Sequence, residues 1–287
     1  MSYRLLPTIS LLILTLPVAT QSGNVQEDKS PHGSGFATVN GINLHYLDWG
    51  GKGEALLFIT GRGDNAHVFD EMAPKFTDRF HVLALTRRGF GESDKPETGY
   101  DVATRAEDVR HFLDIMKIKR VNLVGHSSGG DELTQFASVY PTRTLKLVYL
   151  DAAYDRSNIA AIEAKDPLSM PNRPPESKVQ MAYSKGVANF HPDYKKVKAP
   201  ALSFYALIET HWALTPDTDE PTRKKAEEYI EREVKPFQLK NIELFRKEVV
   251  NGQVVVMRGA RHYFFRDPDP KRRDEVVREI RAFLLSK

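Results

Sequence analysis

Residues Arg120–Gly130 read R-V-N-L-V-G-H-S-S-G-G and contain the pattern that decides the fold. An apolar run, Val121–Val124, stops at Gly125-His126-Ser127-Ser128-Gly129, and a helix-like pattern follows. A G-x-S-x-G sequence between a strand and a helix raises a serine hydroxyl out of a sharp, strained turn. The two glycines are expected because a side chain at either position would collide with neighbouring backbone. Ser127 is therefore the candidate nucleophile.

Composition narrows the class of protein. The chain has 287 residues, of which 41% are hydrophobic, and this length fits one large domain or one domain with an insertion. The 41 basic and 38 acidic residues give a net charge of +3, which is too balanced to indicate a nucleic-acid partner. The chain has no cysteine, so disulfides and thiolate metal sites are excluded.

The first 20 residues have the pattern of a secretory signal peptide. Met1–Arg4 carries one positive charge, Leu5–Val18 is mostly apolar, and small residues follow at Ala19-Thr20. An uncleaved anchor and a misassigned start are the alternatives, but the apolar run is short and contains prolines. We expect a secreted or periplasmic protein without a stable membrane anchor. Residues 21–34 are polar and are expected to be a disordered lead-in to a domain at 35–287.

Strand and helix patterns alternate along the rest of the chain. Asn40-Gly41 lies between two strand patterns and is a strong hairpin signal. Strands are expected at Ala55–Thr60, His81–Thr86, Val121–Val124, Leu145–Leu150, Ala201–Ala206 and Val254–Met257, and helices at Ala66–Phe76, Val102–Met116, Ser128–Tyr140 and Arg272–Leu285. Residues 154–198 do not continue this alternation of strand and helix patterns and resemble an inserted lid. The alternation predicts a mostly parallel sheet with helices on both faces, whose ligand sites lie beyond the carboxyl ends of the strands.

The nucleophile needs a base and an orienting acid at this edge. His262 follows the last expected strand, and imidazole accepts and returns protons near neutral pH. Two carboxylates can complete the set. Glu209 closely follows the strand Ala201–Ala206 and is the preferred acid, while Asp151 directly follows Leu145–Leu150 and is the alternative.

Donors for an oxyanion are expected on two turns. The backbone N–H of Ser128 follows the nucleophile, and that of Arg62 lies in the turn Gly61-Arg62-Gly63. The Arg62 guanidinium is an alternative ligand for an anionic group. Gly61 and Phe264 are expected to contact the substrate. Histidine and carboxylate spacings of known metal motifs are absent, so no metal and no cofactor are expected.

These motifs together resemble the α/β-hydrolase superfamily over residues 36–285. The resemblance rests on the G-H-S-S-G-G turn, the Gly61 turn, the stretch Arg87–Ser93 and the segment Gly259–His262. It implies an eight-stranded, mostly parallel sheet with a short lid insertion. More narrowly, the stretches T-G-R-G-D-N-A-H-V-F-D and Y-L-D-A-A-Y-D resemble a bacterial subgroup of generic hydrolases.

Three features depart from the common family pattern. Thr60 stands where many members have histidine, Ala206 and Glu209 replace the usual glycine and aspartate, and the lid is short. The acid and the substrate class therefore cannot be carried over from the family.

Serine at the nucleophile position indicates attack on carbonyl carbon. Members that resemble haloalkane dehalogenases and epoxide hydrolases use aspartate there instead. The sequence thus predicts a serine hydrolase that acts on a small ester or lactone, with a small-molecule substrate as its partner. A ligand-binding protein on the same fold, a carbon–carbon hydrolase and an acyltransferase are the alternatives, and the oligomeric state is open.

Overall fold

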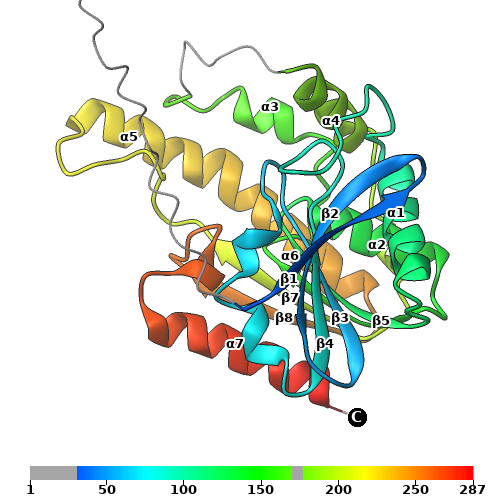
Figure 1. Ribbon diagram of the computed structural model, residues 1–287. Coiled ribbons are helices and arrows are strands. Elements are labelled where there is room, and N and C mark those ends of the chain that lie inside the picture. Colours follow the sequence, from blue (N-terminus) through cyan, green and yellow to red (C-terminus); the bar gives the residue numbers. More distant parts are fainter. Residues whose placement is uncertain (1–30, 170–176, 287) are drawn as a thin grey trace, which may run out of the picture.

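The computed structural model describes residues 31–169 and 177–286, which form an eight-stranded sheet with helices on both faces (Figure 1). The predicted fold is confirmed. The strands are β1 (Gly33–Val39), β2 (Ile42–Gly50), β3 (Glu54–Ile59), β4 (Phe80–Leu85), β5 (Val121–His126), β6 (Thr144–Leu150), β7 (Ala201–Leu207) and β8 (Gly252–Arg258), in the spatial order β1-β2-β4-β3-β5-β6-β7-β8. The predicted signal peptide, residues 1–20, and residues 21–30 of the lead-in lie outside the described residues.

A two-residue turn starts the sheet. Asn40 and Gly41 have φ of 47° and 77°, the backbone that a type I′ hairpin requires. They join β1 and β2 in an antiparallel pair in which Val39 lies opposite Ile42. The hairpin prediction is confirmed. Strand β1 begins at Gly33, two residues before the expected start of the domain.

Strands β3 to β8 are parallel to one another and place the candidate residues at one edge. The last residue of β5, His126, pairs with the last residue of β6, Leu150. Leu150 in turn pairs with Phe204 of β7. Ser127 and Asp151, each the next residue after its strand, therefore emerge side by side at the carboxyl edge.

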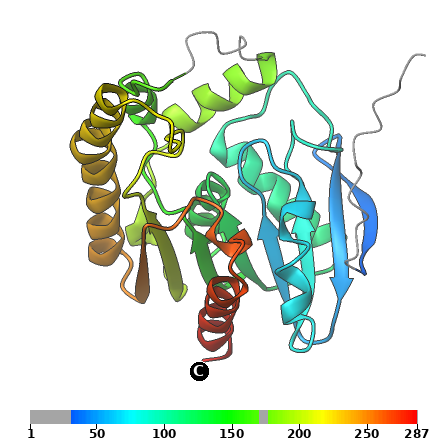
Figure 2. The same ribbon diagram turned by 90° about the vertical axis from the view of Figure 1, so that its left-hand side faces the viewer.

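The helices cover the two faces of the sheet through two apolar clusters. One cluster contains buried side chains of α1, α2 and α6, and the other contains those of η1, η2 and α7. In Figure 2, α7 and the short turns η1 and η2 lie on the side of the sheet turned toward the viewer. The helices and turns are η1 (Ala66–Phe69), η2 (Ala73–Phe76), α1 (Val102–Ile115), α2 (Gly129–Val139), α3 (Ile159–Glu163), α4 (Lys178–Ala188), η3 (Tyr194–Lys196), α5 (Glu220–Tyr229), η4 (Ile230–Val234), α6 (Lys235–Glu248), η5 (Phe264–Arg266) and α7 (Pro270–Leu285).

The single helix expected at Ala66–Phe76 is wrong. The segment forms two 3₁₀ turns, η1 and η2, instead. Pro74 lies in the first turn of η2 and has no N–H to continue a hydrogen-bond ladder from η1. The Asn65 side chain caps η1 by accepting a hydrogen bond from the His67 N–H.

The segment expected as a lid contains α3, α4 and η3. Helix α4 is fixed to the rest of the domain, because Tyr183 and Val187 pack in one cluster with Phe90 and Tyr100. A Cβ at Gly186 would lie 2.3 Å from the Tyr100 carbonyl oxygen, so glycine permits this close approach. Among the described residues, no helix is long and apolar enough to span a membrane.

Candidate active site

Ser127 occupies a strained turn between β5 and α2. Its φ is +53°, a left-handed conformation that is uncommon for a residue with a side chain and that clusters at functional sites. The turn is held on both sides. The Ser127 N–H donates to the Leu150 carbonyl at 3.1 Å, and its own carbonyl accepts from the Gly130 N–H at 3.1 Å.

The flanking glycines are required by backbone contacts, as predicted. A Cβ at Gly125 would lie 3.0 Å from the Gly129 carbonyl carbon and 2.8 Å from a methyl group of Leu133. A Cβ at Gly129 would lie 2.8 Å from the carbonyl oxygens of Ile59 and Thr60. The turn therefore packs directly against the end of β3, where the predicted oxyanion turn begins.

His262 and Asp151 form a hydrogen-bonded pair at the same edge. The Nδ1 of His262 donates to Oδ2 of Asp151 at 2.6 Å, which leaves Nε2 as the ring nitrogen that can accept a proton. The Asp151 side chain is 5% exposed and that of His262 is 40% exposed, so the carboxylate is shielded while the imidazole is accessible. This is the arrangement in which a carboxylate orients a general base.

Asp151 is held as an anion by several donors. Its Oδ1 accepts from the Tyr154 hydroxyl at 2.5 Å and from the Ala206 N–H at 3.1 Å. Burial alone would raise the pKa of Asp151. The hydrogen bond and charge of His262, with the bonds from Tyr154 and Ala206, outweigh burial and lower this pKa below its usual value.

The structure does not bring the preferred acid, Glu209, to His262. Its side chain is 46% exposed, and the nearest ion-pair partner is the Arg258 guanidinium at 3.9 Å. Strand β7 ends at Leu207, and the chain then runs outward, so Glu209 lies in an exposed loop. The preference for Glu209 is corrected in favour of Asp151, the alternative that directly follows β6.

A second histidine–carboxylate pair lies beside the first. The His126 ring centroid is 4.6 Å from that of His262 and 4.5 Å from that of Tyr263. Nδ1 of His126 donates to Asp64 at 3.3 Å, and the Tyr263 hydroxyl donates to the same carboxylate at 3.1 Å. Burial lowers the pKa of His126 to about 4, against the raising effect of Asp64, so this imidazole is neutral near pH 7. His126 therefore packs against its neighbours and bonds locally to Asp64.

The predicted oxyanion turn lies against the nucleophile. A Cβ at Gly61 would be 3.2 Å from Cβ of Ser127 and 2.9 Å from Nδ1 of His126, so only glycine fits here without displacing neighbours. The Arg62 guanidinium lies 5.9 Å from the ring centroid of Tyr183 in α4, and thus faces the lid segment. Ser128 is the N-cap residue of α2, where backbone N–H groups have no partner within the helix.

A buried ion pair supports Ser128, and sequence patterns did not reveal it. Arg87 donates from Nη1 to Glu132 at 2.7 Å and to the Tyr183 hydroxyl at 2.8 Å, and from Nη2 to Oγ of Ser128 at 3.1 Å. Arg105 adds a second cation 3.4 Å from Glu132. Burial disfavours the Arg87 charge, but the Glu132 carboxylate outweighs burial and raises the pKa of Arg87. These contacts connect the segment after β4 to α2, to the turn at Ser127-Ser128 and to α4 of the lid segment.

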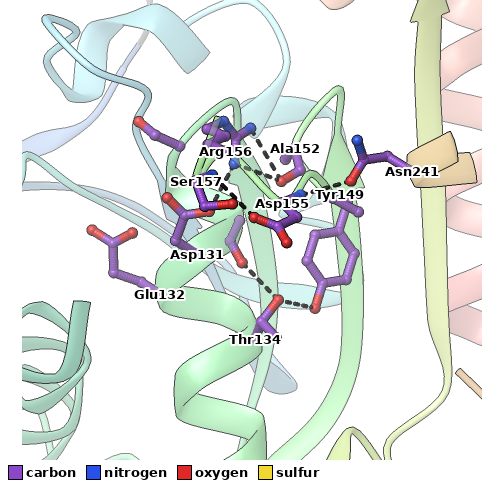
Figure 3. A network of polar contacts seen from close by, with 12 residues as sticks. Asp131, Glu132, Thr134, Tyr149, Ala152, Asp155, Arg156, Ser157 and Asn241 are labelled. Atoms are coloured by element: carbon purple, nitrogen blue, oxygen red, sulfur yellow. Dashed lines mark hydrogen bonds and ion pairs between the residues drawn. The ribbon is translucent and has the colours of Figure 1, made fainter. Parts of the chain in front are cut away.

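A second polar network links α2 to the segment that carries Asp151 (Figure 3). Arg156 donates to Asp131 at 2.7 Å and to the Ala152 carbonyl at 3.3 Å, and the Tyr149 hydroxyl lies 3.1 Å from Oγ1 of Thr134. Burial raises the pKa of Asp131 to about 6, against the opposing charge of Arg156. The network fixes the chain after β6 relative to α2, and therefore fixes Asp151 relative to Ser127.

Phe264 does not lie where a substrate contact was expected. Its side chain is fully buried in the apolar cluster between the sheet and α7, with its ring centroid 5.7 Å from that of Phe204. The 3₁₀ turn η5 directs it inward and leaves its neighbour Tyr263 exposed. The expectation for Phe264 is corrected: it is a core residue.

Comparison with known proteins gives the same fold. The pattern of a family described as the alpha/beta hydrolase fold matches residues 54–233. An esterase from Exiguobacterium antarcticum superposes with a TM-score of 0.66, 15% identity and coverage of 88% of this chain and 100% of the esterase. At this identity the likeness shows the fold alone.

Curated relatives match over shorter segments. An uncharacterized protein of Mycobacterium tuberculosis is 38% identical over 125 residues, which are 44% of this chain and 36% of the relative. The 2-(acetamidomethylene)succinate hydrolase of Mesorhizobium japonicum is 36% identical over 101 residues, or 35% of this chain and 36% of the relative. The matched part of the chain thus spans about a third of the length of these relatives.

Proposed function

The chain belongs to the alpha/beta hydrolase fold family, and we propose that it is a serine hydrolase of small, partly apolar carboxylic esters or lactones. The observation that carries the proposal is the bond between His262 and Asp151 at the edge where Ser127 stands in a strained turn. A serine hydroxyl, an accessible imidazole and a shielded carboxylate are the three groups of acyl transfer by serine.

Each group has a defined role in the proposed reaction. The Ser127 hydroxyl attacks the carbonyl carbon while His262 accepts its proton, and Asp151 stabilises the imidazolium that results. Backbone N–H groups of Ser128 and Arg62 stabilise the oxyanion. The imidazolium then protonates the leaving alkoxide, which departs and leaves an acyl-enzyme. His262 then deprotonates a water molecule, which attacks the acyl carbon. The tetrahedral intermediate collapses by breaking its bond to Oγ of Ser127, which takes the proton from His262, and the carboxylic acid is released.

The relatives support the class of reaction. The names of a hydrolase and an esterase are found among proteins similar to this chain, and one relative is a soluble epoxide hydrolase of Corynebacterium. Ser127 favours carbonyl substrates, because attack of its hydroxyl on a carbonyl carbon gives an ester that water can hydrolyse. Attack on a saturated carbon, as in an epoxide, would give a stable ether. The lid segment carries an exposed methionine, Met181 of α4, and the adaptable side chain of methionine favours a partly apolar substrate.

Covalent labelling tests the proposal. A fluorophosphonate probe should modify wild-type protein at Ser127, as located by peptide mass spectrometry, and should not modify Ser127→Ala. Ser138→Ala is the matched control, because Ser138 lies on the adjacent helix α2 with its hydroxyl bonded to the Thr134 carbonyl. An unreactive wild-type protein would favour ligand binding without turnover. A panel of acyl esters and lactones would then identify the substrate class.

We also propose that the protein is exported, on the pattern of residues 1–20 alone. N-terminal sequencing of the protein from its native host tests this proposal. A mature chain that starts after residue 18 to 22 supports export, and an intact N-terminus on a cytoplasmic protein contradicts it.

A further inference from the structure

His32, His67 and Asp70 form a cluster of metal-ligating side chains separate from the candidate active site. Each offers one ligand atom, and these three atoms lie within 4.8 Å of one another. His32 directly precedes β1, His67 lies in η1, and Asp70 is the C-cap residue of η1. All three side chains are partly buried, so the cluster is accessible but not fully solvated.

The spacing of these side chains is close to that of ligands on a single tetrahedral ion. The ring centroids of His32 and His67 lie 5.3 Å apart. Two imidazoles on one zinc ion, with Zn–N bonds of about 2.1 Å, place their ring centroids about 5 Å apart. Nδ1 of His67 lies 3.0 Å from Oδ2 of Asp70. Two ligand atoms on such an ion are about 3.3 Å apart. The three candidate atoms lie within 4.8 Å of one another, so side-chain rotation has to bring the more distant atoms closer together.

The surroundings suit a cation. His45 stacks on His67 with ring centroids 6.2 Å apart, and its ring nitrogens lie 3.1 Å from Thr86 and 2.9 Å from Ser34. Both of its nitrogens are thus engaged, and His45 is a neighbour of the cluster rather than a ligand. Nδ1 of His45 also lies 3.5 Å from the Glu92 carboxylate, so a further negative group lies beside this histidine.

We propose that His32, His67 and Asp70 bind a divalent transition-metal ion, of which Zn²⁺ is the representative. Two imidazoles and one carboxylate are ligands that zinc prefers, and three protein ligands leave a fourth position for water. The site replaces the expectation from sequence that no metal is bound. That expectation used local spacing, whereas this ligand set joins residues from separate segments of the chain.

The ion would connect two parts of the fold. It joins the residue before β1 to η1, the turn that follows the Gly61–Asn65 loop. Because a ligand that binds only the folded state stabilises it by mass action, zinc should raise the unfolding temperature of the protein. This effect is independent of the proposed hydrolase activity.

Calorimetric titration of untagged, chelator-treated protein with zinc chloride tests the proposal. Wild type should bind one Zn²⁺, and His32→Ala, His67→Ala and Asp70→Asn should each weaken binding at least about tenfold, since even outer-shell partners of metal ligands are worth 10–100-fold. His81→Ala is the matched control, because His81 lies 3.0 Å from Asp48 in a histidine–carboxylate pair outside the cluster. It should bind zinc as wild type does.

Thermal unfolding with and without zinc gives a second readout. Zinc should raise the midpoint temperature of unfolding of wild type and of His81→Ala, but not that of His32→Ala. The His32→Ala variant should fold normally, because it alters only the segment ahead of the sheet. If both His32→Ala and Asp70→Asn bind zinc as tightly as wild type does, the ion lies elsewhere and the proposal is overturned. Failure of the wild type to bind zinc would overturn it as well.

Discussion

The carboxylate of Asp151 and Nδ1 of His262 are 2.6 Å apart, although 111 positions separate them in the chain. The contact exists because β6 and β8 end at the same edge of the sheet, with β7 between them. It orients the imidazole so that Nε2 is available to accept the proton of the Ser127 hydroxyl in the proposed reaction. The account of this protein as a serine hydrolase depends on that orientation.

Removal of the Asp151 charge should abolish most turnover. Asp151→Asn keeps the size of the side chain but cannot stabilise the imidazolium, so kcat on a chromogenic acyl ester should fall by about 10³ to 10⁴, as in serine protease triads. Glu209→Gln should retain nearly full activity, because Glu209 is exposed and pairs only loosely with Arg258. Equal activities of the two variants would refute the assignment of the acid.

Tyr154 should act on catalysis through Asp151. Its hydroxyl donates to Oδ1 of Asp151, and hydrogen bonds to charged groups are worth about 1.5–3 kcal/mol. Tyr154→Phe should therefore lower kcat by about tenfold with little change in KM. Tyr140→Phe is the control, since the Tyr140 hydroxyl donates to Glu107 of α1 instead. A loss confined to KM would show that Tyr154 contacts the substrate rather than positioning Asp151.

The buried Arg87–Glu132 pair should be essential for stability. Arg87→Met leaves the Glu132 carboxylate, which is 1% exposed, with the more distant Arg105 as its remaining cationic partner among the described residues. Breaking a buried pair in this way costs about 3–5 kcal/mol. Urea denaturation should show this loss for Arg87→Met and a far smaller one for Arg281→Met, whose partner Asp78 is exposed. Similar losses in both variants would contradict the prediction.

His126 should make the fold sensitive to acid. Burial lowers its pKa from 6.5 to about 4 in the folded protein, so between these values the unfolded chain binds a proton that the folded chain does not. By linkage, stability is full above pH 6.5 and is lost as the pH falls toward 4, by on the order of 3 kcal/mol. His126→Gln cannot be protonated and should show a shallower decline between these pH values. Parallel stability curves for wild type and variant would exclude this role for His126.

Local patterns in the sequence were sufficient for the turns. Asn40-Gly41 predicts the hairpin, and the spacing of Gly125 and Gly129 around Ser127 predicts the sharp turn between β5 and α2. In each case backbone geometry restricts the residue type. The alternation of strands and helices was sufficient for the sheet. The position of His262 after the last strand predicts that it lies at the carboxyl edge of the sheet.

Contacts between distant segments were beyond such patterns. Glu209 and Asp151 both follow strands, and only the outward path of the chain after Leu207 separates them. The Arg87–Glu132 pair depends on how two elements pack, and Phe264 was misplaced because a short turn directs it into the core. Pro74 marks the break between η1 and η2 in the sequence, because proline has no N–H to continue a helix.

The central claim is that turnover passes through an ester of Ser127. Wild-type protein mixed with an activated acetyl ester and quenched in acid within milliseconds should show a mass increase of one acetyl group, mapped to the peptide that contains Ser127. The increase should appear before steady-state product release and should be absent in Ser127→Ala. Turnover of the ester without an acyl group on Ser127, or with the group on another residue, would contradict the account.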